Sequence, residues 1–180
     1  MAQLKVVKDI MLDVFNYPHL PYWFTIRQAI GIAKKVFMNG ESKCHDPMTI
    51  LVFDEKYNLM GTLSLKDILK GLEPRFLQPV TTAQVPEEDE SGLALLWEAI
   101  FTENAAAMAD QPVGEVLTPV KHFVRQDDPI TRAAHTMIHN DLLLLPVLDD
   151  NKFVGVVRMI EIFDELSGVV LTGTDAGTKS

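Results

Sequence analysis

The chain has 180 residues, 47% hydrophobic and 23% charged, which suits one or two folded domains and excludes disorder throughout. A formal net charge of −9 excludes nucleic acid and anionic membranes as partners, because both are bound through clustered basic side chains. The single cysteine excludes an intramolecular disulfide, and the lack of a membrane-length apolar run or secretory signal predicts a cytoplasmic protein without membrane insertion.

An internal repeat organises the chain, and each copy is predicted to read β-α-β-β-α. Short apolar and polar alternations predict the leading strands, and apolar residues at three- and four-residue steps predict the helices. Two apolar runs around a polar turn predict a hairpin in each copy. The first copy is predicted at 7–11, 26–37, 49–53, 59–63 and 65–72. The second copy is predicted at 113–117, 130–138, 143–148, 153–157 and 159–166.

A linking helix is predicted between the two copies, within residues 86–110. Its acidic first turn suits the positive end of the helix dipole, and its apolar face, which includes Trp97 and Phe101, is expected to pack in the core or in a dimer. The predicted organisation is a first unit, a linker with an amphipathic helix, a second unit and a disordered tail. These span residues 1–78, 79–110, 111–170 and 171–180.

Residues 61–69 resemble the end of a CBS domain, in which a glycine and an apolar strand are followed by Ser or Thr, two residues and Asp. Residues 145–149 and 128–130 are similar to the hairpin strand and the helix start of the same family. The ordered set, found twice within residues 5–170, resembles a pair of CBS domains, also called a Bateman module. The resemblance implies an α+β fold of two β-α-β-β-α CBS units, joined by a linking helix and packed about a pseudo-two-fold axis with two grooves between them.

The resemblance also implies a function. It implies a regulatory module that catalyses nothing, requires no cofactor, and binds AMP, ADP, ATP or a related adenosyl ligand in these grooves. Such modules regulate an enzyme or a transporter and often pair, so we expect a homodimer with an adenine nucleotide as its ligand. The alternative is a dimerisation or protein-interaction module whose grooves are degenerate and bind no ligand.

Ser64 and Asp67 are the strongest candidates for ligand binding. A carboxylate can accept hydrogen bonds from both ribose hydroxyls, and a hydroxyl with the free N–H groups at the helix start near Lys66 can bind phosphate. The competing interpretation needs no ligand, because Ser-x-x-Asp at a helix start also forms a capping box.

The second copy departs from this pattern, with Arg158 in place of the hydroxyl and Glu161 in place of Asp. Glu161 can still accept from a ribose and Arg158 can pair with phosphate, but the two can equally pair with each other. The segments that lead into the first helix of each copy imply three further ligand contacts, namely Thr25, His122 and Val124. The aromatic run 17–23 can instead fill a groove, which favours the alternative without ligand.

No catalytic residue and no metal site is predicted. His135 and His139 have a spacing that suits a metal, but no third ligand is near them in sequence. The acidic run 149–151 lacks the glycine and the distal glutamate of a calcium loop and is predicted to be a hairpin turn.

Overall fold

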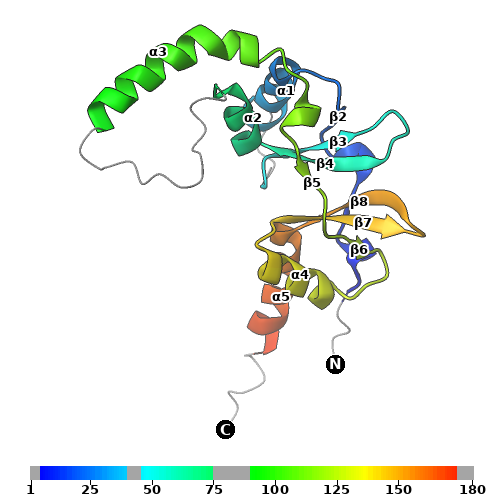
Figure 1. Cartoon of the computed structure of the whole chain (residues 1–180). Helices are drawn as coiled ribbons and strands as arrows, with labels where there is room; N and C mark the ends of the chain where they lie inside the picture. The colour runs from blue at the N-terminus through cyan, green and yellow to red at the C-terminus, as the bar shows by residue number, and fades with distance from the viewer. Residues whose placement is uncertain (1–4, 40–45, 75–89, 174–180) are drawn as a thin grey trace. The chain divides into compact units, whose positions relative to one another are not determined.

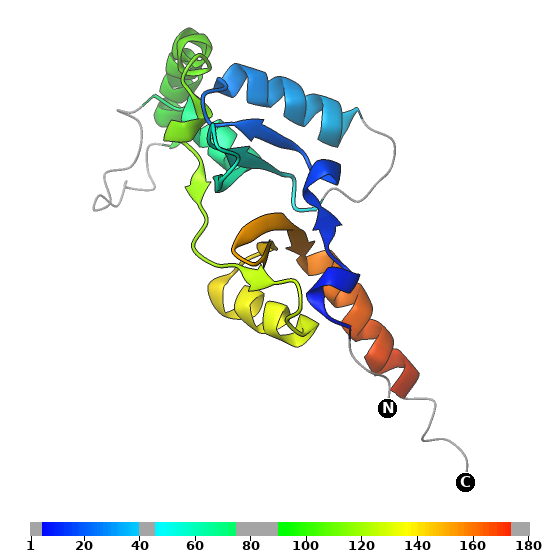
Figure 2. The ribbon, with the colours of Figure 1, turned by 90° about the vertical axis from the view of Figure 1, so that its right-hand side faces the viewer.

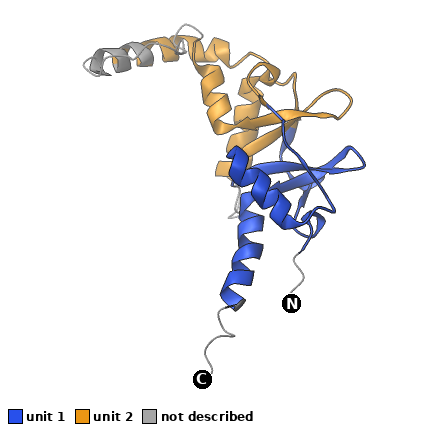
Figure 3. Cartoon of the chain, turned by 60° about the horizontal axis from the view of Figure 1, so that its bottom comes forward, with its two compact units in different colours: residues 1–19, 44–47, 119–180 blue, residues 20–43, 48–118 orange. Residues whose placement is uncertain are grey.

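A computed structural model describes residues 5–39, 46–74 and 90–173 of the chain. In these residues the fold is α+β, with five α-helices and two four-stranded sheets, which confirms the predicted class. The chain divides into two compact units (Figure 3). Unit 1 comprises residues 1–19, 44–47 and 119–180, and unit 2 comprises residues 20–43 and 48–118. The first 19 residues therefore group with the second repeat.

Unit 2 is built on the sheet β2-β3-β4-β5. Its strands are β2 (His19–Pro21), β3 (Thr49–Phe53), β4 (Leu59–Ser64) and β5 (Thr118–Pro119). Its helices are α1 (Ile26–Ala33), which continues as a π-helical segment over Lys34–Met38, α2 (Leu65–Leu72) and α3 (Glu90–Met108). Helices α1 and α2 cover one side of the sheet (Figure 1) and bury their apolar stripes against it. The core includes Ile26, Ala29, Ile50, Val52, Leu63 and Ile68.

Unit 1 is built on the sheet β1-β8-β7-β6. Its strands are β1 (Leu12–Asp13), β6 (Val124–Arg125), β7 (Leu144–Asp149) and β8 (Lys152–Arg158). Its helices are α4 (Ile130–Asn140) and α5 (Met159–Gly173), and Figure 2 shows α5 continuing beyond the sheet. The turn of the β7–β8 hairpin has Asp150 and Asn151 at φ values of 43° and 63°, as a two-residue hairpin turn with matching twist requires. The predicted hairpin turn is confirmed.

Each repeat gives its leading segment to the sheet of the other repeat. Strand β1, from the first repeat, pairs antiparallel with β8, and β5, from the second repeat, lies beside β4. Two glycines allow this approach: a Cβ on Gly155 would overlap the carbonyl oxygen of Leu12, and a Cβ on Gly61 would overlap that of Thr118. This exchange is why the first 19 residues belong to unit 1.

The leading strands predicted at 7–11 and 113–117 are wrong. These residues form 3₁₀ turns at Val7–Asp9 and Val113–Glu115, followed by the two-residue strands β1 and β5. The apolar residues that pack inward recur every third residue, which is the period of a 3₁₀ turn and not that of a strand. In the first turn the Asp9 carboxylate also accepts the Val6 N–H at 3.0 Å, which fixes the turn locally.

The last helix is longer than predicted. It runs to Gly173 and not to Leu166, so residues 171–173 of the predicted disordered tail are helical, while residues 174–180 lie outside the described part. No proline interrupts this segment, and the Thr172 hydroxyl donates to the Gly168 carbonyl at 2.8 Å. In the part of the chain that is described, no helix combines the length and apolar character needed to cross a bilayer. The packing of the two units about a pseudo-two-fold axis stays a prediction.

Candidate functional site

The junction between β4 and α2 brings Ser64 and Asp67 together in a capping box. The Ser64 hydroxyl accepts the Asp67 N–H at 3.1 Å, while the Oδ2 atom of Asp67 accepts the Ser64 N–H at 2.8 Å and its hydroxyl at 2.7 Å. Two backbone donors at the helix start are thereby satisfied within the protein. The capping interpretation of Ser-x-x-Asp is therefore confirmed.

The second carboxylate oxygen of Asp67 also has a protein donor. The Thr118 hydroxyl, on the exchanged strand β5, donates to Oδ1 at 3.2 Å, a longer and more exposed bond than those in the capping box. Each carboxylate oxygen has two lone pairs, so Asp67 retains acceptor capacity, and the Thr118 bond is the weakest of the set. Lys66, the second residue of α2, is exposed beside this junction. The first turn of this helix thus carries a hydroxyl and a carboxylate that are bonded to each other, and an exposed lysine.

The equivalent junction in unit 1 holds an ion pair. Glu161 accepts the Arg158 N–H at 3.1 Å and its Nε–H at 2.9 Å, and the Nη2 atom of Arg158 also contacts Glu161. Their side chains are only 11% and 19% exposed, so the pair is largely withdrawn from water. Glu161 caps the helix start as Asp67 does, and its longer side chain also reaches the guanidinium group. Arg158 and Glu161 therefore pair with each other, which is one of the two possibilities that the sequence left open.

Tyr17 lies near this ion pair. Its ring is 5% exposed and its hydroxyl donates to the Pro47 carbonyl at 3.1 Å. Burial raises the pKa of Tyr17, and Arg158 and Glu161 lie close enough to act on it electrostatically. The first aromatic residue of the run 17–23 is therefore enclosed in unit 1. Trp23, farther along this run, is 52% exposed.

The other three predicted contacts differ in character. Thr25 caps α1: its hydroxyl accepts the Gln28 N–H at 3.2 Å, and the Gln28 side chain accepts the Thr25 N–H at 2.9 Å. Val124 is 1% exposed and belongs to the core of unit 1. His122 is exposed in the segment before β6.

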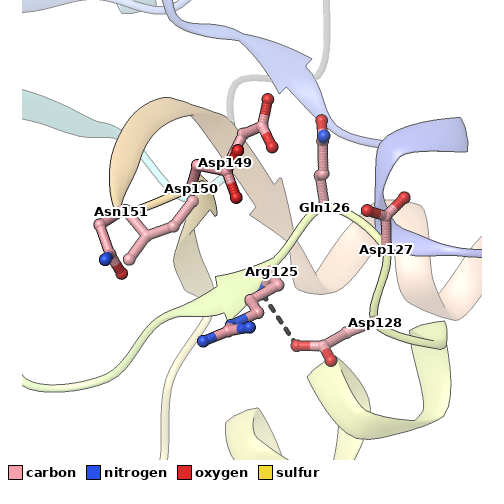
Figure 4. Close-up of a pocket in the computed structure, with 8 residues that line it drawn as sticks. Arg125, Gln126, Asp127, Asp128, Asp149, Asp150 and Asn151 are labelled. Atoms are coloured by element: carbon pink, nitrogen blue, oxygen red, sulfur yellow. Dashed lines mark hydrogen bonds between the residues drawn. The ribbon is translucent and has the colours of Figure 1, made fainter.

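A polar cavity of about 250 Å³ lies elsewhere in unit 1, between the β7–β8 turn and the segment before α4 (Figure 4). Its lining is Arg125, Gln126, Asp127, Asp128, Leu148, Asp149, Asp150 and Asn151. Four carboxylates against one guanidinium make it unfavourable for a phosphate. The Asp128 carboxylate is already used, because it accepts the Arg125 N–H at 2.8 Å and a guanidinium N–H of Arg132 at 3.1 Å.

The structure gives no support to a metal site in the regions it describes. Within residues 5–39, 46–74 and 90–173, no three His, Cys, Asp or Glu side chains are grouped so that they could hold an ion. The His135 and His139 rings lie 4.2 Å apart, centroid to centroid, on the exposed side of α4.

Comparison with known proteins agrees with this architecture. A family model for the CBS domain matches residues 113–168, which is the second repeat. The chain has the fold of a CBS-domain pair. It is similar to CBSX2 in complex with AMP, with a TM-score of 0.58 and 19% identity over 92% of this chain and 98% of that one. No match was found among the curated proteins.

Two further solved structures are similar to this chain. The CBS domain pair of protein MJ0100, in complex with 5′-methylthioadenosine and S-adenosyl-L-methionine, gives a TM-score of 0.58 at 20% identity, over 93% of this chain and 99% of that one. The cytosolic domain of the Mg²⁺ channel MgtE, in complex with ATP, gives a TM-score of 0.51 at 21% identity, over 82% of this chain and 44% of that one. The chain thus spans less than half of the MgtE structure.

Proposed function

We propose that this CBS-domain pair is a regulatory module that binds an adenine nucleotide or a related adenosyl compound at the Ser64–Asp67 junction. The observation that carries the proposal is the gathering of a hydroxyl, a carboxylate and an exposed lysine at one strand-to-helix junction. Similar folds have been solved with AMP, ATP and two adenosyl compounds. In the proposed complex Asp67 accepts the ribose hydroxyls, and Lys66 with the start of α2 binds phosphate.

We propose one nucleotide per chain. At the equivalent junction of unit 1, the Glu161 carboxylate is engaged by Arg158, and the buried Tyr17 lies near the pair. A ribose at that position would have to break a largely buried ion pair, which is costly. At the Ser64–Asp67 junction it would displace only the 3.2 Å bond from Thr118. Ligand contacts of Thr25, His122 and Val124 stay predictions.

The biological setting is also a proposal. We propose a cytoplasmic homodimer that carries out no catalysis and controls an enzyme or a transporter. The likeness to the cytosolic domain of a Mg²⁺ channel and to the soluble part of a magnesium transporter supports a transporter as the regulated partner. The homodimer is supported by the large apolar side chains that remain exposed on α5 and around α2.

Calorimetric titration with AMP, ATP, 5′-methylthioadenosine and S-adenosyl-L-methionine tests the nucleotide site. We expect one of them to bind the parent protein, and Asp67→Ala to weaken that binding more than tenfold. Loss of two hydrogen bonds to a charged group, each worth about 1.5–3 kcal/mol, gives at least this effect. The matched control is Gln28→Ala, which breaks the capping box of α1 in the same unit. It should lower the melting temperature and leave affinity unchanged.

Two outcomes would contradict the proposal. If Asp67→Ala binds as tightly as the parent protein, the ligand lies elsewhere. If the parent binds none of the four compounds at millimolar concentration, the alternative replaces it, namely an interaction module without ligand. One observation favours that alternative: the polar groups of both junctions already have protein partners.

A further inference from the structure

The exchanged strand β5 is attached to unit 2 by few bonds. It is the edge strand of its sheet and consists of Thr118 and Pro119, which are both exposed (Figure 1). Proline has no backbone N–H, so Thr118 has the only one in this strand, and neither side chain is buried. The bond from the Thr118 hydroxyl to the Oδ1 atom of Asp67 is therefore a substantial part of the attachment of β5.

Strand β5 is also where the chain passes from one unit to the other, because unit 2 ends at Thr118. Before β5 the segment is fixed: the N–H groups of Val113 and Gly114 donate to backbone carbonyls of residues 22–24 at 2.7 and 2.9 Å. After β5, residues 120–123 form neither helix nor strand. The Thr118 bond thus lies at the boundary between a fixed part and an irregular part of this segment.

The other exchanged strand lacks this bond. The Leu12 carbonyl of β1 faces Gly155 closely, and the Thr118 carbonyl of β5 faces Gly61 in the same way, so the two residues correspond. Leucine has no hydroxyl to donate. In unit 1 the acid at the helix start takes a side-chain donor from Arg158, on its own junction, instead. The acid is therefore hydrogen-bonded to the exchanged strand only in the unit where we place the ligand.

We propose that the Thr118 hydroxyl is an internal competitor of the ligand: a ribose hydroxyl that donates to Oδ1 of Asp67 displaces it and releases β5 from α2. The inference rests on the nucleotide site proposed above and adds how that site is regulated. Hydroxyl bonds to a carboxylate are normally about 2.5–2.7 Å long, so a ribose hydroxyl can replace the 3.2 Å bond with a stronger one. By linkage, attachment of β5 lowers the affinity for ligand by the factor by which ligand lowers the attachment.

Calorimetric titration of Thr118→Val with the four compounds named above tests the competition, because valine has nearly the shape of threonine and no hydroxyl. An ordinary hydrogen bond favours the bonded state by about twofold to tenfold, so removing the competitor should tighten binding by about three- to tenfold. Loss of a merely structural support would weaken binding, so the direction of the change is decisive. Thr118→Ser keeps the hydroxyl and should lie closer to the parent than to Thr118→Val.

Thr102→Val is the matched control for this titration. It removes the hydroxyl that donates to the Glu98 carbonyl at 2.7 Å in α3 of the same unit, away from the junction. The affinity should equal that of the parent.

Limited digestion with trypsin measures the release of β5. Lys121 is exposed in the irregular stretch that follows the strand. When opening is fast relative to cleavage, the cleavage rate follows the population of the open form. Saturating ligand should therefore speed cleavage after Lys121 severalfold in the parent. Thr118→Val and Asp67→Ala each remove one partner of the bond, so each should be cleaved at the faster rate without ligand. Cleavage after Lys56, exposed in the β3–β4 turn, should not change and is the internal control.

The outcomes separate this competition from the nucleotide site itself. A parent protein that binds none of the four compounds contradicts the nucleotide site and the competition with it. A parent that binds, with Thr118→Val binding equally or more weakly, keeps the nucleotide site and overturns the competition. Tighter binding by Thr118→Val without faster cleavage after Lys121 would mean that β5 stays attached, which overturns its release. Circular dichroism of each variant establishes that it is folded.

Discussion

Replacing Gly155 by alanine should destabilise unit 1 markedly, because this glycine allows the exchanged strand β1 to lie against β8. A Cβ there would overlap the Leu12 carbonyl oxygen and come within 3.2 Å of the Leu12 carbonyl carbon. Both are backbone atoms, so no side chain can rotate away and β1 itself must shift. Overpacking of this kind costs about 1–3 kcal/mol, and the upper half of that range is expected against backbone. For a chain of this length, about 2 kcal/mol corresponds to roughly 4–8 °C of melting temperature.

Differential scanning calorimetry of Gly155→Ala beside Gly168→Ala provides the measurement. Gly168 lies in α5 of the same unit, and a Cβ there would meet nothing within 4 Å. Alanine has the better helix propensity, so Gly168→Ala should stabilise the protein by up to about 1 kcal/mol. Opposite signs for the two substitutions are the expected result. If Gly155→Ala melts within about 1 °C of the parent, β1 does not pack on β8 as described.

Three further substitutions test the two helix junctions and the buried tyrosine. Asp67→Ala should cost about 1 kcal/mol in urea unfolding, the value of a helix cap. Glu161→Ala should cost more, about 2 kcal/mol, because it also removes the carboxylate partner of a mostly buried arginine, and equal costs would contradict the ion pair. Tyr17→Phe should cost about 1 kcal/mol at neutral pH, the value of its hydrogen bond to Pro47. Burial raises the pKa of Tyr17, so its contribution is complete below about pH 10, where the unfolded tyrosine begins to ionise. Above about pH 10 the contribution of Tyr17 to the free energy of unfolding falls by about 1.4 kcal/mol per pH unit. Chemical unfolding should therefore show the stability difference between the parent and Tyr17→Phe shrinking in alkali. A difference that stays constant with pH would refute the burial argument.

Most of the secondary structure follows from local patterns in the sequence. The helices α1, α2 and α4 have buried residues at the expected period, as Ile130, Ala133 and Met137 illustrate for α4. Both hairpins form where two apolar runs flank a polar turn, and their buried residues come in continuous runs. The leading segments were mispredicted because apolar residues three apart in a five-residue window resemble a strand with one irregular step. Only tertiary structure distinguishes a 3₁₀ turn from a strand here, since the buried Val7 belongs to the core that packs on the other repeat's sheet.

The exchange of leading segments is also what hid part of the candidate site. Thr118 lies 51 residues from Asp67, and no local signal connects them. The repeat does contain one indirect signal, namely Gly61 and Gly155 at matching places in β4 and β8. A glycine inside a strand often marks a close backbone approach, and here each marks the strand that arrives from the other repeat. What the sequence lacks is the identity of the arriving segment, because that depends on how the chain crosses between its two sheets.

The two junctions share one capping arrangement and differ in the bonds formed around it. In both repeats an acidic residue three positions into the helix start accepts the backbone N–H of the last strand residue, Asp67 from Ser64 and Glu161 from Arg158. With serine at the strand end, the acid keeps lone pairs and an exposed neighbour, Lys66, so a polar ligand can be added without breaking an ion pair. With arginine at the strand end, the acid forms an ion pair within the protein, and the buried Tyr17 lies near it. Both acids therefore make the same capping bond and differ in their other partners, because the residue before the helix is serine in one repeat and arginine in the other. If a ligand binds at one of these junctions, this residue determines which acid has acceptor capacity left for it.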